Sequence, residues 1–374
     1  MSVPGDISDR LRIAVEADTP IVVQLTEQLT WLIASGMVRE GDTLPPIRAL
    51  ADDLGVHMHT VREAYHRLEA AGLVSIRTRK GTTVLRLDAG TLSGHEDDPR
   101  SFMIGILLPG PSLAYNHFIE GIHKTTAGSG LLPLITYNND NPFLARRNLY
   151  QLIAKKVDGL IVVSMGDIRL VEDGLDPTGL PPIVYVDAPK IQVNAVNPDS
   201  ESAAKSVTEH LLGHGYERVA LVTAPTDWES VEPVFRGYKH ALNKKNAFDA
   251  NLVVEVNDFL SESGFDGAME LLDRDAGVGA IFAGDDHLAI GVMRALKESG
   301  ASIPEDIAVA AYGDFDLAAI TEPPLTTAHL PAYEMGTRAV ERLQALFEGQ
   351  VEEHAPLLLD CPLILRRSCG CGMD

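Results

Sequence analysis

The 374-residue sequence contains only three cysteines, Cys361, Cys369 and Cys371, and all three lie near the C-terminus. Three cysteines are too few for the disulfide framework that stabilises small secreted domains. Cys369 and Cys371 offer two thiolates for a soft metal, but the sequence shows no histidine near them, so they fall short of a closed zinc site. We therefore predict neither a disulfide-stabilised fold nor a metal site, and we expect no cofactor.

Long apolar runs are also missing. No window approaches the roughly 20 apolar residues of a membrane-spanning helix. The start, MSVPGDISDRLR, has neither the basic nor the apolar region of a signal peptide. Hydrophobic residues make up 45% of the chain, which is ample for buried cores, and the length suggests two or three domains. We expect a cytoplasmic protein that does not associate with membranes.

Basic residues are scarce, because 31 Lys and Arg stand against 53 Asp and Glu, for a formal net charge of -22. Residues 1–90 hold ten basic and twelve acidic side chains, whereas the rest of the chain holds 21 and 41. Solubility explains most of this charge. An acidic C-terminal part nevertheless repels DNA, which suits a chain whose nucleic-acid contacts lie in its N-terminal part.

Local motifs of catalysis are absent as well. The sequence has no GxSxG elbow, no Walker loop, no HExxH and no GxGxxG that opens a helix after a strand. Its 12 histidines and many acids can always be combined into Ser-His-Asp sets, but no local motif raises one above chance. We expect that the protein is not an enzyme.

Residues 44–84, in contrast, have the pattern of a complete DNA-binding module. The run ALADDLG, residues 49–55, has helical spacing and a terminal glycine, and a second helical periodicity begins at Val61. After Gly72, alternating residues predict a two-stranded wing with Arg79 and Lys80 at its tip. Residues 48–86 hold seven basic and four acidic side chains, so the segment is locally basic, as phosphate-binding surfaces are.

Residues 20–84 resemble the winged helix-turn-helix of the GntR family from end to end, through Pro20, Gln24, Leu44, Pro45 and many later positions. The resemblance implies that Arg62 lies in or beside the major groove of double-stranded operator DNA and that the wing flanks the minor groove. The complete set of candidate DNA contacts is Arg48, His57, His59, Thr60, Arg62, Arg67, Arg77, Arg79, Lys80, Gly81 and Thr82.

The chain departs from the GntR pattern at two places. Pro46 and Ile47 replace a usual Ser-Glu pair, and His57 and Met58 replace a usual Ser-Arg pair. Because Met cannot make the bidentate contact that Arg makes with guanine, we expect a different base preference. His57 and His59 either contact DNA or are solvated residues at the helix start, where His57 acts as a weak cap.

Residues 88–101, DAGTLSGHEDDPRS, are polar and rich in Gly, Asp and Ser, and we expect a linker there between domains at 1–87 and 102–371. From Phe102 on, short runs rich in Val, Ile and Leu alternate with helix-length segments. This pattern is typical of doubly wound α/β folds with parallel sheets. Sites in such folds lie beyond the C-terminal ends of the strands.

Residues 102 to about 371 resemble the ligand-binding domain of the LacI family, a relative of periplasmic sugar-binding proteins. The phrases that carry the resemblance include IGILLPG, VDGLIVVS, HLLGHGYERVALVTAP and AIFAGDDHLAIGVMRAL. It implies two lobes joined by three crossovers, with a ligand enclosed between them. The first lobe is expected at about 102–191 with the helix at 332–349, and the second at about 192–328 with the last strand.

Taken with the N-terminal module, the chain resembles GntR-type regulators with a LacI-like effector domain, such as arabinose-responsive repressors. This resemblance implies a homodimer that binds operator DNA and is released by a small-molecule effector. A solute-binding protein is a weaker alternative because it would require a signal peptide. An architectural DNA protein is weaker too, because it has no need of an elaborate ligand domain.

Candidate effector contacts are the residues that follow predicted strands or match cleft positions of the LacI family. They are Ser112, Tyr115, Phe143, Ser164, Asp187, Trp228, Arg236, Asp285, Asp286 and Asp314. Carboxylates suit sugars because each offers two acceptors to vicinal hydroxyls, and an aromatic face such as that of Trp228 or Phe143 covers the apolar side of a pyranose. Asp286 is equally well interpreted as a helix N-cap, and Tyr115 as a packing residue.

Two departures from the LacI pattern leave the effector open. Val234 stands where the family commonly carries an Arg that grips sugar hydroxyls, and Gly313 replaces the first Asp after an aromatic residue. A neutral sugar or sugar derivative is our first expectation, on the family resemblance. Because acidic residues occupy several candidate positions, a cationic or amino-bearing metabolite is the alternative.

Overall fold

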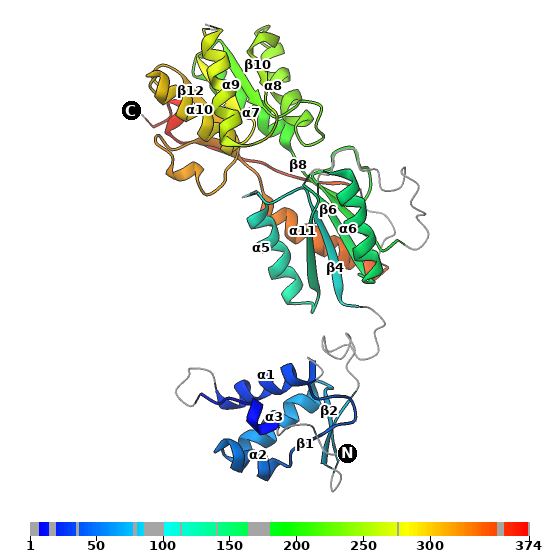
Figure 1. The fold of residues 1–374 in the computed structure, drawn as a ribbon. Helices are drawn as coiled ribbons and strands as arrows, with labels where there is room; N and C mark the ends of the chain where they lie inside the picture. Colours follow the sequence, from blue (N-terminus) through cyan, green and yellow to red (C-terminus); the bar gives the residue numbers. More distant parts are fainter. Residues whose placement is uncertain are drawn as a thin grey trace. The chain divides into compact units, whose positions relative to one another are not determined.

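The computed structural model describes residues 7–14, 20–34, 37–77, 81–85, 101–112, 114–139, 141–163, 180–274, 277–349 and 355–372. The chain divides into two compact units, Met1–Met103 and Ile104–Asp374, which we call the head and the body (Figure 1). Arg79 and Lys80, at the predicted wing tip, and Ser164, a candidate effector contact, lie outside the described residues, as does most of the predicted linker.

The head is a winged helix-turn-helix, as predicted. Its elements are η1 (Ile7–Arg10), α1 (Ile21–Ala34), β1 (Thr43–Leu44), α2 (Ile47–Leu54), α3 (Met58–Ala70), β2 (Val74–Arg77) and β3 (Gly81–Val84). The strands form an antiparallel sheet in the order β1-β3-β2. Helix α2 ends at Gly55, whose φ of +64° is readily adopted only by glycine. The buried Tyr65 donates a hydrogen bond to the Pro45 carbonyl at 2.8 Å, which fixes α3 against the segment before α2.

The first lobe of the body contains a six-stranded sheet in the order β14-β8-β7-β6-β4-β5. Its strands are β4 (Met103–Leu108), β5 (Leu132–Tyr137), β6 (Gly159–Val163), β7 (Ile183–Val186), β8 (Ala195–Pro198) and β14 (Leu357–Leu359). Its helices are α5 (Ala114–Ala127), α6 (Pro142–Ala154) and α11 (Ala332–Phe347). The described pairings along β4, β6, β7, β8 and β14 are all parallel.

The second lobe contains another six-stranded sheet, in the order β10-β9-β11-β12-β13-β15. Its strands are β9 (Val219–Thr223), β10 (Val253–Glu255), β11 (Ala280–Ala283), β12 (Ala308–Gly313), β13 (Thr326–His329) and β15 (Leu363–Ile364). Its helices are α7 (Ser200–Gly213), α8 (Glu232–Asn243), α9 (Ser261–Asp273) and α10 (Asp286–Ser299), with short 3₁₀ turns η2 (Ala250–Leu252), η3 (Ala318–Ile320) and η4 (Arg367–Cys369). Only β15 pairs antiparallel among the described strands of this sheet.

The chain passes between the two sheets three times, after β8, after β13 and after β14. The predicted lobe boundary near residue 191 is therefore too early. Strand β8 belongs to the first sheet because Ala195 pairs with Tyr185 of β7, and all four β8 residues are buried there. The short strand β14, near the end of the chain, also belongs to the first sheet, because it pairs with β8.

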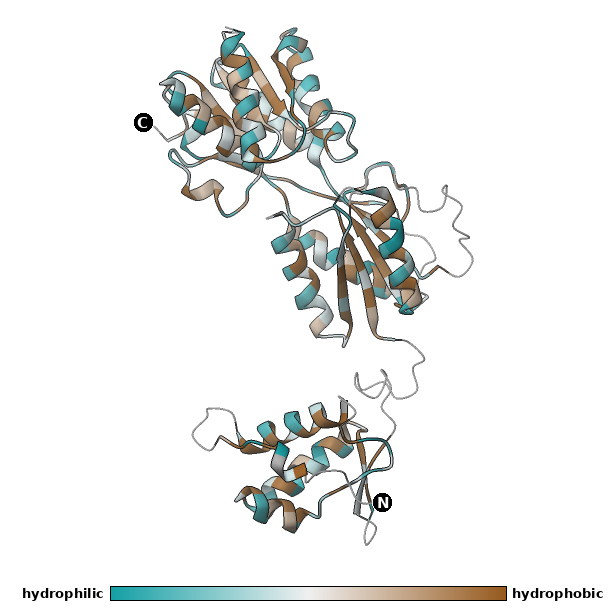
Figure 2. Cartoon of the chain, viewed as in Figure 1, coloured by the Kyte–Doolittle hydropathy of each residue, from teal (hydrophilic) through white to brown (hydrophobic). Residues whose placement is uncertain are grey.

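The strands at the centre of each sheet consist mainly of apolar residues (Figure 2). Every residue of β6, β9 and β11 is buried, because helices cover parallel sheets on both faces and leave no solvent side for polar residues. Helices α7 and α8 approach so closely that a Cβ added at Gly237 would lie 2.1 Å from the Glu201 carbonyl. Among the described residues, no helix has the length and apolar character needed to cross a membrane.

Candidate functional site

A cavity of about 740 Å³ lies in the body, beyond the C-terminal ends of strands from both sheets. Residues that follow β4, β5 and β7 form its wall on the first lobe, and residues that follow β9, β10, β11 and β12 form its wall on the second. This is the expected place for a ligand in open parallel sheets. The volume falls in the range of small-molecule sites, roughly 300 to 1,000 Å³.

Five of the predicted effector contacts line this cavity. They are Ser112, Tyr115, Asp187, Trp228 and Asp285, and each follows a strand of one of the two sheets. These five residues are far apart in the sequence but meet at the cavity, because the C-terminal ends of the strands of both sheets face it.

Asp187 is the most exceptional of the five. It follows β7 directly with a φ of +52°, and no hydrogen bond to its carboxylate is seen among the described residues. Burial, and to a lesser degree the nearby Glu229 charge, raises the pKa of Asp187 to about 6. The buried hydroxyl of Thr223, at the end of β9, also lines the cavity without a hydrogen-bond partner in the described structure. A buried hydroxyl without a partner is uncommon, so Thr223 suits a polar ligand, and the half-buried carboxylate of Asp187 offers further acceptors to it.

Asp285 caps α10. Its Oδ1 accepts a hydrogen bond from the His287 amide at 2.6 Å and lies 2.9 Å from Nδ1 of the same histidine. The contact with Asp285 raises the pKa of His287, which also lines the cavity. The interpretation of Asp286 as the N-cap is therefore wrong, since the cap is the preceding residue.

Asp286 and Asp314 do not line the cavity, and the structure corrects both predictions. Asp286 is only 1% exposed and accepts hydrogen bonds from the Phe315 amide at 2.6 Å and the Thr327 hydroxyl at 2.8 Å. Burial raises the pKa of Asp286 to about 7. Asp314 is engaged by Arg366. The two carboxylates therefore stabilise the loop after β12, because their hydrogen-bond partners belong to that loop and to the strands next to it.

Phe143 and Arg236 are also misplaced by the sequence prediction. Phe143 lies in the first turn of α6 with 87% of its surface exposed, and it is not one of the cavity-lining residues. Arg236 lies on an exposed face of α8 and forms ion pairs with Glu201 at 2.7 Å and Glu232 at 3.2 Å. Val234 lines the cavity instead, so the wall lacks a guanidinium at that position.

The sequence prediction missed several groups of the cavity wall. Acidic side chains from Asp227, Glu229 and Asp258 join Asp187 and Asp285, so five carboxylates and one lysine, Lys190, are among the lining residues. The aromatic residues Phe259, Tyr312 and Phe315 line it as well. Trp228 and Phe259 meet edge to face, with ring centroids 6.0 Å apart. The rule that sites follow strand ends would have found the residues after β10, because Asp258 and Phe259 come shortly after that strand.

The head presents a second candidate site around α3. Arg48, His59, Arg62 and Arg77 are exposed, Gly81 begins β3 in a left-handed conformation, and Thr60 is half-buried. The Nδ1 atom of His57 accepts a hydrogen bond from the His59 amide at 3.1 Å, so His57 caps α3. Thr82 is buried, which removes it from the predicted set of contacts. Arg67 stays exposed but forms an ion pair with Glu63 at 3.3 Å.

Comparisons with known proteins agree with this division. Residues 22–84 match the model of the bacterial regulatory proteins of the gntR family, and residues 208–369 match that of the periplasmic binding protein-like domain. The chain joins a GntR-type domain to a periplasmic binding protein-like domain.

Similar proteins are transcriptional regulators. The regulator CelR of Thermobifida fusca is 31% identical over 221 residues, which cover 58% of this chain and 65% of CelR. The repressor CytR of Escherichia coli (strain K12) is 28% identical over 258 residues, or 68% of this chain and 75% of CytR. A LacI-family regulator from Enterococcus faecium, solved with bound ribose, is 25% identical, with a TM-score of 0.63 over 71% of this chain and 98% of that one. The periplasmic binding protein-like domain is therefore of the LacI-regulator kind in its fold.

Proposed function

We propose that this GntR-type chain is a ligand-responsive transcriptional regulator, a repressor whose head binds operator DNA and whose body binds the effector that releases it. The observation that carries the proposal is the cavity between the two sheets, whose wall presents the buried Thr223 hydroxyl, which has no hydrogen-bond partner in the described structure, and the half-buried Asp187 carboxylate. A chain that only shaped DNA would have no use for such a pocket. The regulatory relatives favour the same function.

We propose that DNA recognition uses the exposed side of α3. His59 and Arg62 are exposed and lie three residues apart on α3, so their side chains project from the same side of the helix and are accessible to DNA. Arg48 at the start of α2 and Arg77 at the end of β2 add positive charge, which phosphates attract. His57 contributes as a cap that orders the start of α3.

We propose a sugar or sugar derivative as the effector. Trp228, Phe259 and Tyr115 provide aromatic surface, and the carboxylates provide paired acceptors for hydroxyl groups. The excess of five carboxylates over one lysine favours a second candidate, an amino-bearing metabolite, because a cation would offset that negative charge. An amino sugar would satisfy both features of the wall.

We also propose that the regulator is a homodimer. Strand β5 is an edge strand of the first lobe, and apolar side chains stand exposed on it and on the adjacent α6. They are Leu132, Ile135, Tyr137, Phe143 and Tyr150, with exposed fractions of 36 to 87%. Exposed apolar side chains beside the outer edge of a sheet are typically covered by a partner. A second copy is the expected occupant, because two-fold symmetric repressors bind symmetric operators.

Effector and DNA are coupled through the two lobes. Three crossovers connect the sheets, so a ligand held by both walls favours a closed arrangement of the lobes. Coupling is reciprocal, and regulators of this kind typically show roughly 1 to 3 kcal/mol between the two ligands. A compound that lowers DNA affinity must therefore bind the DNA-free protein more tightly.

Thermal unfolding against sugars, sugar phosphates, amino sugars, nucleosides and polyamines tests the proposal. A ligand at about 100 times its Kd adds roughly 2.7 kcal/mol to the free energy of unfolding and raises the Tm measurably. Each compound that raises the Tm is then added to complexes of the full chain with an operator selected from random DNA. We expect weaker DNA binding. A compound that stabilises the protein but leaves DNA affinity unchanged would remove the regulatory link.

A further inference from the structure

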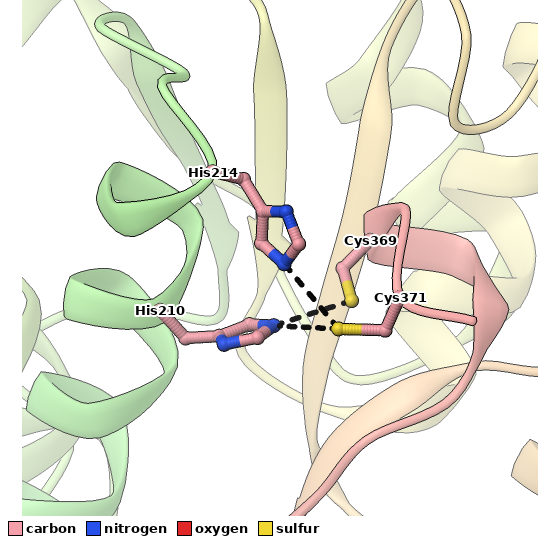
Figure 3. Close-up of side chains that lie close together, drawn as sticks. All are labelled: His210, His214, Cys369 and Cys371. Atoms are coloured by element: carbon pink, nitrogen blue, oxygen red, sulfur yellow. Dashed lines mark hydrogen bonds between the residues drawn. The ribbon is translucent and has the colours of Figure 1, made fainter. Parts of the chain in front are cut away.

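Two pairs of metal-binding side chains meet on the second lobe (Figure 3), and none of the four residues lines the effector cavity. His210 and His214 lie four residues apart at the C-terminal end of α7 and therefore project from the same side of the helix. Cys369 ends the 3₁₀ turn η4, and Cys371 follows two residues later. The histidine pair and the cysteine pair are about 160 residues apart in the sequence, so only the fold brings them together.

The distances fit a single tetrahedral ion. The Nε2 atom of His210 lies 3.3 Å from Sγ of Cys369 and 3.5 Å from Sγ of Cys371, and Nε2 of His214 lies 3.3 Å from Sγ of Cys371. All four donor atoms lie within 4.8 Å of one another. A tetrahedral zinc ion with Zn–N of about 2.0 Å and Zn–S of about 2.3 Å would hold nitrogen and sulfur about 3.5 Å apart. The donors already stand close to those positions.

Neighbouring groups hold the cysteine segment in place. Cys369 is fully buried, and its Sγ lies 3.0 Å from the Thr326 hydroxyl oxygen, within hydrogen-bond distance. The Tyr216 hydroxyl donates to the Cys369 carbonyl at 3.3 Å. Gly370 has a φ of +93°, and a Cβ there would lie 3.3 Å from the same Tyr216 oxygen. Such outer contacts are typical of ligands that are oriented before the metal binds.

We propose that His210, His214, Cys369 and Cys371 bind one structural zinc ion that ties the C-terminal segment to α7. Two thiolates and two imidazoles fill a tetrahedron, and an S₂N₂ set of this geometry favours zinc. Binding transfers the thiol protons of both cysteines to solvent, so the filled site carries no net charge. The sequence analysis predicted no metal site on the premise that no histidine lies near the cysteines. That premise is wrong in the folded chain, because α7 brings two histidines to the cysteine pair.

The metal content of the purified full-length protein tests this site directly. We expect one zinc per chain by inductively coupled plasma mass spectrometry. Cys371→Ser and His214→Ala should each lose most of that zinc. Cys361→Ser and His240→Ala are matched controls, because Cys361 lies outside the cluster and His240 is an exposed histidine in the last turn of α8. Both controls should keep it.

Cobalt provides a second measurement that does not depend on the variants folding. Adding Co²⁺ to the chelator-treated wild-type protein should give intense ligand-field absorption of a four-coordinate ion and a sulfur-to-cobalt charge-transfer band, and zinc should displace both. Zinc should also raise the Tm of the wild-type protein, because it binds only the folded site.

Three outcomes would overturn the proposal. The first is that the wild-type protein shows neither bound zinc nor the cobalt spectrum of a four-coordinate ion. The second is a Cys369–Cys371 disulfide, found by mass spectrometry in protein purified without reductant under nitrogen. The third is that both ligand variants keep their zinc. None of these measurements involves DNA or an effector. The zinc site can therefore fail while the regulatory function holds, and the reverse is equally visible.

Discussion

Arg366 donates a hydrogen bond from Nη2 to Oδ1 of Asp314 at 2.7 Å, while Oδ2 of the same carboxylate lies 3.0 Å from Nδ1 of His329. Asp314 directly follows β12, His329 ends β13 and Arg366 follows β15, so one carboxylate joins the ends of three strands. Burial alone raises the pKa of Asp314, but the hydrogen bonds from His329 and Arg366 outweigh it and lower the pKa below its usual value.

Asp314→Asn should lower the free energy of unfolding by about 2 kcal/mol at neutral pH, between the values for exposed and fully buried pairs. The pKa is lowered in the folded state, so this stabilisation is present above the unfolded value of 3.8 and is lost as the pH falls through the folded value. Urea unfolding at neutral and acidic pH measures it, with the exposed Asp273→Asn as control. Effector affinity should not change, and a loss of about tenfold would restore Asp314 as a ligand contact.

The two tryptophans separate the two sites spectroscopically. Trp228 lines the cavity, whereas Trp31 lies on α1 of the head with 58% of its surface exposed. In the Trp31→Phe variant, effector binding should still change the fluorescence of the remaining tryptophan. In Trp228→Phe that change should vanish. Trp228→Ala should weaken binding about tenfold, which corresponds to roughly 1.4 kcal/mol of lost aromatic contact. An effector-dependent signal from Trp31 alone would place the ligand elsewhere.

The pH dependence of binding distinguishes the two effector classes. Because the pKa of Asp187 is raised to about 6, its carboxyl is largely neutral below that pH and ionised above it. The affinity for an amino-bearing effector should therefore rise with pH through about 6 and then level off. The affinity for a neutral sugar should change little.

Asp187→Asn should flatten this profile in isothermal titration calorimetry. His287 also lines the cavity, and its contact with Asp285 raises its pKa. As the pH rises, His287 loses its positive charge, which also increases the affinity for a cationic effector. His287→Gln serves as the comparison. A profile that survives Asp187→Asn but disappears in His287→Gln would assign the effect to the histidine.

Much of the architecture was predictable because helical periodicity, glycine ends and apolar strand runs are local properties of the sequence. The same local view predicted Trp228, in a polar loop after a strand, and the resemblance to the LacI family predicted Asp187; both line the cavity. It failed where partners come from distant segments. The residues around Asp314 in the sequence do not indicate its contact with Arg366, and those around Cys369 do not indicate its contact with His210. Only the packing of β15 and η4 on the second lobe brings these residues together.

DNA binding by the head should depend on Arg62, which is exposed on α3. Arg62→Ala should weaken operator binding by about 1 to 3 kcal/mol, or at least fivefold, because it removes either a base contact or a phosphate contact. The salt dependence of the affinity separates these two roles. Loss of a phosphate contact lowers the slope of log K against log salt by about one, whereas loss of a base contact changes sequence preference instead. Fluorescence anisotropy at several salt concentrations measures both quantities.

Arg338→Ala is the matched control for this experiment, since Arg338 is an exposed arginine of α11 in the body, paired with Glu334 and Glu341. It should leave operator affinity unchanged, and neither variant should alter effector affinity. Arg67→Ala should have a smaller effect than Arg62→Ala, because Glu63 already engages the Arg67 guanidinium at 3.3 Å. If Arg62→Ala binds the operator as tightly as the wild-type protein, the exposed face of α3 is not the surface that contacts DNA.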